Sequence, residues 1–462
     1  MPRRDRDETA AQRQGRQQRR LEHLQLLKQA RGVQRSRIAA RLGVGVGQVS
    51  ELFNGKVELG AETQSAILET LGVDEAEFLA GVEGRFHAEV YLARVLKPRK
   101  RQAEHVEERA RKTPSKPYEV RRLPELAAGL QELRLLDAEA ARTLAFDVLA
   151  TDFHERQPAA PSALCQACVA LAAIYRTRGN YGATAFFLLR GLHTAGRVPG
   201  LRAPVLRAVA SLARDLGDLD EAVAAAVQTG AEYLAAADYC GLGRSLTALG
   251  GFHVYRGDLT TALTALRCGL PIVSADEWFI RYAAFQTLAL CHLYRGELEE
   301  ALEFAERGLE VLDSESAAAP LPRAAVLWLR AEIQLAIGRP EQAADDLGEV
   351  LQVYMAEGFS ALDCALVATR LALAYLLAAD LEALSELKAR VSGLAKRFKK
   401  SEKLLAATFA DLLRKAQVGE VTVELVAESY HALLAGAENP PCEATLPKTP
   451  HGSKMGPAPK GS

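Results

Sequence analysis

A chain of 462 residues is longer than a single hydrophobic core usually serves, so the sequence predicts two or more folding units. Almost half of the residues are apolar and a quarter are charged, which is typical of a soluble globular protein. Ala and Leu dominate while aromatic residues make up only 6%, so the composition argues against β-sheet and predicts an all-α fold.

The formal net charge of −1 hides an asymmetry between the two ends of the chain. Residues 1–122 carry 25 Lys or Arg against 17 Asp or Glu, whereas residues 123–462 carry 32 against 41. Within the first part, the positive charge is concentrated in residues 1–41 and 97–122. Such basic flanks suit a polyanion such as nucleic acid, and they equally suit solvated, disordered segments.

In chain order, residues 1–20 are polar and Arg-rich, and we interpret them as a flexible basic arm that can continue into the first helix. Residues 21–96 show short amphipathic helices separated by Gly, which predict a compact helical domain. Residues 97–122 are basic and contain Pro, as in a linker with room for one helical stretch. The tail, residues 437–462, is rich in Pro, Gly, Ser and Lys, so we expect it to be disordered.

Residues 35–54, RSRIAARLGVGVGQVSELFN, fit the pattern of a helix-turn-helix motif. Its first helix needs an apolar and then a small residue where the second helix crosses, its sharp turn needs a Gly between apolar residues, and its second helix turns two apolar residues inward. All seven of these positions are filled as required, by Ile38, Ala39, Leu42, Gly43, Val44, Val49 and Leu52.

The stretch GVGVGQVSELFNGK, followed by AETQSAILETLGVDEAEF, resembles the Cro/repressor-type helix-turn-helix domain and in particular the lambdoid phage repressors. The resemblance implies a five-helix domain in which a recognition helix enters the major groove of double-stranded DNA. It also implies that a basic arm before the domain embraces the duplex. The five helices would span residues 21–30, 35–42, 46–53, 62–71 and 74–79.

Carried over by position, the resemblance places base reading on the recognition helix and phosphate contacts at its two flanks. The base-reading positions are Val46, Gly47, Ser50 and Glu51, with Gln48 reaching a base edge if the helix rolls slightly. The phosphate contacts fall on Arg35 and Asn54, and we add Arg37 and Lys56 as basic neighbours. Val46 and Gly47 offer no hydrogen bond to a base, so we expect modest specificity, or specificity from dimer symmetry, DNA shape or the arm.

The segment 123–436 repeats with a period of about 40 residues. Each unit has an apolar-periodic helix, a Gly, an apolar or aromatic residue two positions later and a small residue five positions later. The turn positions are Gly179, Gly217, Gly257, Gly296 and Gly338, with Ala379 as the exception, and they are followed by Thr184, Ala222, Ala262, Ala301, Ala343 and Leu384. Each unit is therefore predicted to be a helical hairpin that stacks on its neighbours into a superhelix.

These units resemble the tetratricopeptide-repeat family, whose pattern is matched at Tyr175, Gly179, Tyr181 and Thr184. The resemblance implies an α-solenoid of helical hairpins, with longer helices or loops than the family's 34-residue unit. His253 and His292 occupy equivalent positions in two units, and we interpret them as packing residues, with ligand or pH-sensor roles as the alternative. We also assign Trp278 and Trp328 to packing first.

The seven cysteines show no disulfide framework, and Cys165 and Cys168 lie in an apolar helical run, so we expect reduced, buried thiols and a cytoplasmic protein. No secretory signal and no membrane-spanning run is apparent, and no metal-ligand spacing, phosphate-binding loop or nucleophile motif stands out. We therefore expect no cofactor, no metal, no membrane association and no enzymatic activity.

Joining this kind of head to tetratricopeptide repeats resembles the peptide-responsive regulators of bacteria. The resemblance implies a transcriptional regulator that binds double-stranded DNA, while its repeats bind a peptide or protein or mediate homodimerisation. The alternative is a repeat-based adaptor with a degenerate head that binds DNA weakly or not at all.

Overall fold

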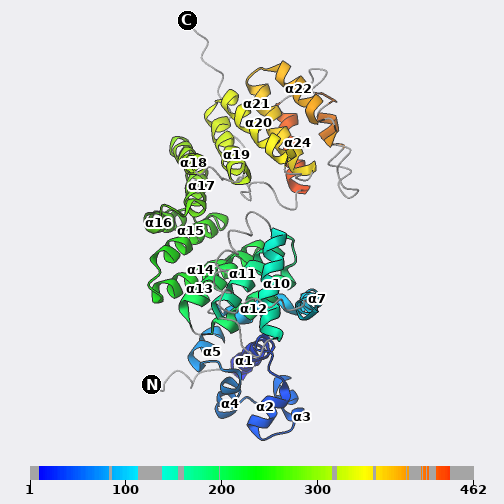
Figure 1. The fold of residues 1–462 in the computed structure, drawn as a ribbon, viewed down its shortest axis with the longest axis vertical. Coiled ribbons are helices and arrows are strands. Elements are labelled where there is room, and N and C mark those ends of the chain that lie inside the picture. The colour runs from blue at the N-terminus through cyan, green and yellow to red at the C-terminus, as the bar shows by residue number, and fades with distance from the viewer. Residues whose placement is uncertain are drawn as a thin grey trace. The chain divides into compact units, whose positions relative to one another are not determined.

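The computed structural model describes residues 10–82, 86–112, 138–154, 161–196, 198–314, 320–356, 361–391, 393–394, 407, 409–412, 414–415 and 423–436. The described residues are helical or in turns and contain no strand, so the predicted all-α fold is confirmed. The contacts divide the chain into two compact units, Met1–Ser245 and Leu246–Ser462 (Figure 1). The start of the basic arm, the residues that join 112 to 138 and the predicted tail lie outside the described residues.

The chain begins with the five predicted helices, α1 (Ala10–Ala30), α2 (Arg35–Leu42), α3 (Val46–Phe53), α4 (Ala61–Leu71) and α5 (Glu75–Val82). The bounds of α2 and α3 agree with the sequence prediction, and α1 starts eleven residues before the predicted helix. Residues 10–20 of the predicted arm are therefore helical, as their Ala, Gln and Arg content favours.

A single apolar core holds the five helices together. Leu24, Ile38, Val49, Ile67 and Phe78 come one from each helix, and all are at most 1% exposed. The turn before the recognition helix depends on Gly43, which has φ +66° and whose N–H donates to the Ala39 carbonyl. Because a left-handed backbone is costly for any residue with a Cβ, this position favours Gly.

Two further helices, α6 (Ala88–Leu96) and α7 (Lys100–Lys112), follow the five, with a short 3-10 turn between them. The helix α6 contacts α1 on one side and the repeat helix α12 (Tyr181–Ala195) on the other, and α7 contacts α12 and α10 (Ala138–His154). The segment predicted as a linker therefore contains a helix that packs on the first repeat. No contact tests the predicted domain boundaries themselves, which stay predictions.

The repeats form paired helices as predicted. The first helix of each hairpin is α11 (Pro161–Thr177), α13 (Pro199–Asp215), α15 (Tyr239–Tyr255), α17 (Trp278–Arg295), α19 (Pro320–Ile337) or α21 (Ala361–Leu377). The second is α12, α14 (Leu219–Ala235), α16 (Leu259–Gly269), α18 (Leu298–Asp313), α20 (Pro340–Ala356) or α22 (Leu381–Val391). Most of these helices have 15 to 18 residues, which accounts for a repeat longer than 34.

The turn of every hairpin has the same backbone conformation. All five predicted glycines have positive φ, between +68° and +86°, and Ala379 takes the same left-handed conformation with φ +58°. The residue five positions after each turn is buried in every unit, from Thr184 at 1% exposure to Leu384 at 4%. The turn reverses the chain, and the small residue lets the second helix approach the first.

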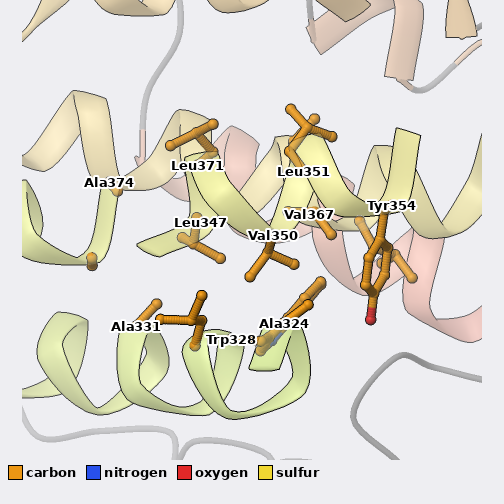
Figure 2. Close-up of a cluster of buried hydrophobic side chains, with 14 of the residues drawn as sticks. Ala324, Trp328, Ala331, Leu347, Val350, Leu351, Tyr354, Val367, Leu371 and Ala374 are labelled. Carbon is orange, nitrogen blue, oxygen red and sulfur yellow. The ribbon is translucent and has the colours of Figure 1, made fainter. Parts of the chain in front are cut away.

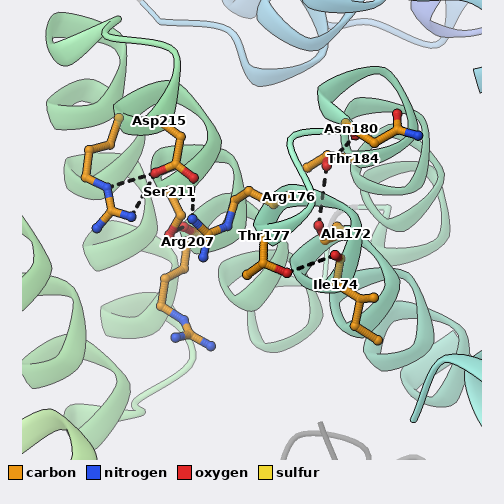
Figure 3. Close-up of polar contacts among 10 residues, drawn as sticks. Ala172, Ile174, Arg176, Thr177, Asn180, Thr184, Arg207, Ser211 and Asp215 are labelled. Atoms are coloured by element: carbon orange, nitrogen blue, oxygen red, sulfur yellow. Dashed lines mark hydrogen bonds and ion pairs between the residues drawn. The ribbon is translucent and has the colours of Figure 1, made fainter. Parts of the chain in front are cut away.

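The first turn also shows how the polar groups of a hairpin are satisfied. Asn180 caps α12 by accepting a hydrogen bond from the Ala183 N–H at 3.0 Å, and the Thr184 hydroxyl donates to the Asn180 carbonyl at 3.0 Å. Figure 3 shows the Thr184 hydroxyl between the two helices, within 3.4 Å of the Ala172 carbonyl oxygen of α11. A buried hydroxyl is thus accommodated without an unpaired donor.

The second unit has a continuous core across successive hairpins. Figure 2 shows Trp328 of α19 against the side chains of α20, with Leu371 and Ala374 of α21 on the far side. Trp328 is 3% exposed and its ring lies 6.3 Å from that of Tyr354, which confirms the packing role predicted for it. The last described helix, α24 (Val423–Gly436), contacts α21, where the Arg370 guanidinium lies 4.4 Å from the centre of the Tyr430 ring.

The two repeat histidines also pack. The His292 ring stacks on Phe304 of α18 at 5.2 Å, and its Nδ1 lies 2.7 Å from a Glu297 carboxylate oxygen. His253 is buried at 8% exposure, 3.3 Å from Asp258 in the equivalent turn. Cys165 and Cys168 are buried in α11 without a disulfide, and burial raises the pKa of the Cys165 thiol to about 11, so it stays protonated near neutrality.

The left-handed Ala379 predicts a stabilising substitution. Replacing Ala379 by Gly removes the Cβ strain of the left-handed backbone. This gain exceeds the loss from the greater conformational entropy of the unfolded chain, so we expect the free energy of unfolding to rise by about 0.5–1 kcal/mol. Chemical denaturation of the whole chain measures this. The matched substitution Gly338→Ala, at φ +86°, should lower the same free energy by a similar amount. An unchanged or lowered stability of Ala379→Gly would contradict the prediction.

Candidate nucleic-acid interface

The residues predicted to meet DNA gather on the solvent side of α2, α3 and the turn after α3. Eight of the nine are exposed and Ser50 is half-buried, while Val49, Leu52 and Phe53 turn the other side of α3 into the core. The exposed eight are Arg35, Arg37, Val46, Gly47, Gln48, Glu51, Asn54 and Lys56. The fold therefore presents the predicted set together, and their roles in DNA binding stay predictions.

Three polar side chains of this set are engaged within the protein. The Gln48 side-chain oxygen accepts a hydrogen bond from the Gly45 N–H at 3.0 Å, which satisfies one of the free donors at the start of α3. The Arg35 guanidinium donates to the Ser50 hydroxyl at 3.0 Å and so connects the start of α2 to the recognition helix. The cap does not use the Gln48 amide N–H groups, which can still donate to a base, whereas the Gln48 oxygen and the Ser50 hydroxyl would be shared between the protein and a base.

The electrostatics of this surface are mixed. Arg35, Arg37 and Lys56 supply donors for phosphate oxygens, and the guanidinium of Arg35 has donors left after its bond to Ser50. The Glu51 carboxylate lies exposed on the same helix and can only accept, so it suits a cytosine amino group and repels phosphate. The surface is better equipped to bind the DNA backbone than to distinguish bases.

Beside this surface, the N-terminal part of α1 lines a polar cavity of about 530 Å³ with the turn that follows α3. Arg16, Arg20 and three glutamines come from α1, and Gly55 and Leu59 come from the turn. The sequence analysis placed positive charge before the domain but could not predict that a regular helix would carry it against this turn.

The sequence analysis missed a second polar site, where the head meets the first repeats within the first unit. The Tyr91 hydroxyl of α6 donates to an Asp218 carboxylate oxygen at 2.8 Å, and Arg94 lies 3.5 Å from Glu221 of α14. Each pair joins residues 127 positions apart in sequence. Neither short-range periodicity nor a motif signals such a pair, which only the tertiary fold brings together.

Charged side chains continue this junction toward α5 and α13. Arg202 of α13 lies 3.1 Å from Glu232 of α14 and 3.8 Å from Glu77 of α5, and Glu77 lies 3.3 Å from the His87 ring. The Arg31 guanidinium at the end of α1 donates to Glu89 of α6 at 2.6 Å. We call the residues around Tyr91, Arg94, Glu89 and Arg202 the head–repeat junction.

Three histidines from three elements lie in the head–repeat junction, and burial lowers the pKa of each. The pKa of His23 in α1 falls to about 4, because the neighbouring His87 and Arg94 add to the effect of burial. Burial lowers the pKa of His87, although the carboxylates of Glu77 and Glu89 act in the opposite direction. Burial also lowers the pKa of His193 in α12, where Glu89 acts in the opposite direction. These rings are neutral at pH 7.

Among the helices of the described residues, none combines the length and the apolar character that a membrane span requires. Within the same residues, no group of three or more His, Cys, Asp or Glu side chains is arranged to hold a metal ion.

Comparison with known proteins supports the two parts of the chain separately. A family model described as helix-turn-helix matches residues 24–78, so the chain carries a helix-turn-helix domain there. Among solved structures, the apo form of RapI is similar with a TM-score of 0.50 and 11% identity, over 68% of this chain and 86% of that one. BtubC (BKLC) from P. vanneervenii has a TM-score of 0.38 and 12% identity, over 52% of this chain and 93% of that one. No curated protein matches the sequence.

The likeness to RapI shows a shared helical fold, and the family match identifies residues 24–78 as a helix-turn-helix domain.

Gly47 in the recognition helix predicts a second stability change. A Cβ added there meets no atom within 4 Å, so Gly47→Ala should raise the free energy of unfolding of the head by about 0.5–1 kcal/mol through helix propensity alone. Thermal denaturation followed by circular dichroism measures it. Gly43→Ala, which forces a Cβ into a left-handed turn at φ +66°, is the control and should destabilise. Equal effects of the two substitutions would be inconsistent with this account.

The histidines predict an acid-sensitive junction. Because the pKa of His23 is lowered from 6.5 to about 4 on folding, the unfolded chain binds more protons in this interval. Stability should therefore be full above pH 6.5 and decline as the pH falls toward 4, by about 1–2 kcal/mol from His23 after allowance for solvent screening. Urea denaturation at several pH values tests this. His23→Phe, which cannot titrate, should show a shallower decline, and an identical pH profile would refute the assignment.

Proposed function

We propose that this protein is a DNA-binding transcriptional regulator, with a helix-turn-helix head and a repeat domain that binds a peptide or protein partner or mediates homodimerisation. The observation that carries the proposal is the helix-turn-helix head itself, whose recognition helix has one exposed side, with Arg35 bonded to Ser50 in the middle of that helix and Asn54 and Lys56 directly after its end. Donors beside an exposed helix side that can enter a groove are the arrangement that phosphate contacts need.

The proposed DNA complex depends on the backbone more than on bases. Arg35, Arg37 and Lys56 supply charge-assisted contacts, whereas Val46 offers only an apolar contact to a thymine methyl and Gly47 offers none. A homodimer would bind two half-sites, so it would contact twice as many base pairs as one head does. Such a regulator would act in the cytoplasm, without a membrane, a cofactor or catalysis.

The repeat domain has polar side chains that suit a peptide partner. The buried Nε atom of Arg207 in α13 and the buried side-chain oxygen of Gln166 in α11 have no hydrogen-bond partner among the described residues. The helices α11 and α13 contact each other, and the Arg176–Asp215 ion pair joins them, as Figure 3 shows. A peptide that displaces the side chains covering these atoms would supply the missing hydrogen bonds from its amides or carboxylates.

The second candidate function is a repeat-based adaptor whose degenerate head binds DNA weakly or not at all. One observation favours it: Gln48 and Ser50, the two neutral polar side chains that could read bases, are both hydrogen-bonded within the head. The two functions differ in one measurable property, because an adaptor has little or no salt-dependent affinity for a duplex.

Salt dependence of duplex binding tests the regulator. We expect affinity for double-stranded DNA to fall steeply with salt, and Arg35→Ala to make the slope of log K against log salt shallower by about 1 for each head bound. Arg267→Ala, which removes an exposed charge from α16 in the second unit, is the matched control and should leave the slope unchanged.

Two outcomes would decide against the proposal. The absence of duplex binding even at low salt would reject the regulator and favour the adaptor. Binding with an unchanged slope in Arg35→Ala and an unchanged affinity in Asn54→Ala would reject the docking through α2 and α3. Genome-wide mapping of the protein, compared with a variant that carries both substitutions, would then show whether the same surface sets its occupancy in the cell.

A further inference from the structure

The head–repeat junction encloses a cavity of about 300 Å³, which is the size of a small-molecule site. One wall comes from the head side, with His23 of α1, Gly81 of α5, and Phe86 and Arg94 at the start and the end of the α6 region. The other wall comes from the repeat helix α14, with Asp220, Glu221 and Ala224. All of these residues belong to the first unit.

A buried imidazole nitrogen in this cavity lacks a partner. His23 is only 8% exposed, and its Nε2 atom has no hydrogen-bond partner among the described residues. Its ring lies against Gly81 so closely that a Cβ there would come within 2.5 Å of the imidazole. The Nδ1 atom of His87 is also buried and without a partner among those residues, and the two rings are 5.5 Å apart.

Unpaired buried polar atoms cost free energy unless something outside the chain satisfies them. A neutral imidazole that carries its proton on Nδ1 offers Nε2 as an acceptor. Protonation of His23 is disfavoured by burial and by His87 and Arg94, so the ring is neutral near pH 7. A ligand that donates to Nε2 selects the tautomer whose proton is on Nδ1, and in that tautomer the cavity presents an acceptor that needs a donor.

The charges of the cavity point to a cationic donor. Glu221 and Asp220 place two carboxylates on the α14 wall, and Arg94 is the one cation among the residues that line the cavity. Arg94 is 62% exposed and holds Glu221 at 3.5 Å, which is a loose pair in a well-hydrated position. Glu221 can therefore exchange this partner at little cost.

We propose that this cavity binds a small organic cation, a primary amine with an apolar body. Its ammonium would donate hydrogen bonds to His23 Nε2 and to the Glu221 carboxylate. Phe86, Val90 and Ala224 would cover the apolar part. The proposal goes beyond DNA binding and holds whether or not the head binds DNA.

An amine bound in this cavity weakens the polar contacts between α6 of the head and α14 of the repeats. The amine competes with Arg94 for Glu221, and this ion pair joins α6 to α14. The Tyr91–Asp218 hydrogen bond remains as the neighbouring contact between the same two helices. An amine is thus placed where it loosens the Arg94–Glu221 pair, one of the two polar contacts described between α6 and α14.

Isothermal titration of the full chain with phenethylamine tests the proposal, with 3-phenylpropionate as the anionic probe of similar shape. We expect one amine to bind per chain, and the carboxylate to bind at least about tenfold more weakly, because the α14 wall repels it. Glu221→Gln should weaken amine binding about tenfold or more. Glu300→Gln, an exposed neutralisation on α18 in the second unit, is the matched control and should change nothing.

Two more variants separate binding from damage to the fold. Arg94→Met keeps an apolar stem and removes the competing guanidinium, so it should strengthen amine binding several-fold, which a disrupted junction would not do. Ala224→Leu fills the cavity without changing its charge and should abolish binding while the circular dichroism spectrum is retained.

The proposal is overturned if phenethylamine shows no saturable binding up to about 10 mM, a concentration far above the dissociation constant expected of a preformed cavity. Stronger binding of the carboxylate also overturns it, since the cavity would then be an anion site. Amine binding that survives both Glu221→Gln and Ala224→Leu would place the amine elsewhere and equally reject it.

Discussion

The structure depends on one constraint, the close approach of two helices across a left-handed turn. At each turn a residue with positive φ reverses the chain, and five positions later a buried residue, Ala or Thr in five of the six hairpins, lets the second helix lie against the first. The six turns from Gly179 to Ala379 share this geometry, and contacts of α12 with α13, α16 with α17, α18 with α19 and α20 with α21 join successive hairpins. Stability is therefore distributed over neighbouring contacts rather than concentrated in one core.

The head obeys a different constraint. Its five helices enclose a core of their own, built on Ile38, Val49 and Ile67, and this core leaves one side of α3 to solvent. Within the first unit, however, α6 contacts both α1 and α12, so the described part of the head packs directly on the first repeats. The head–repeat junction adds polar contacts between α6 and α14.

Both the candidate DNA surface and the junction are places where polar groups are imperfectly paired. On α3, Gln48 caps its own helix and Arg35 holds Ser50, so that reading a base competes with an internal hydrogen bond. In the junction, His23 and His87 have buried nitrogens without a partner among the described residues. Unpaired groups of this kind cost stability, and a partner that supplies the missing bond gains correspondingly.

The sequence by itself determined the helical class, the bounds of α2 and α3, the repeat period and the turns at Gly179 to Ala379, because these follow from short-range periodicity and from residues that tolerate a left-handed backbone. It also identified the nine residues that α2, α3 and the following turn present together. Only the tertiary structure decided that Gln48 and Ser50 are already engaged, that α6 joins head to repeats, and that Tyr91 meets Asp218. These contacts depend on side-chain geometry or link residues up to 127 positions apart, and a periodic pattern carries no information about either.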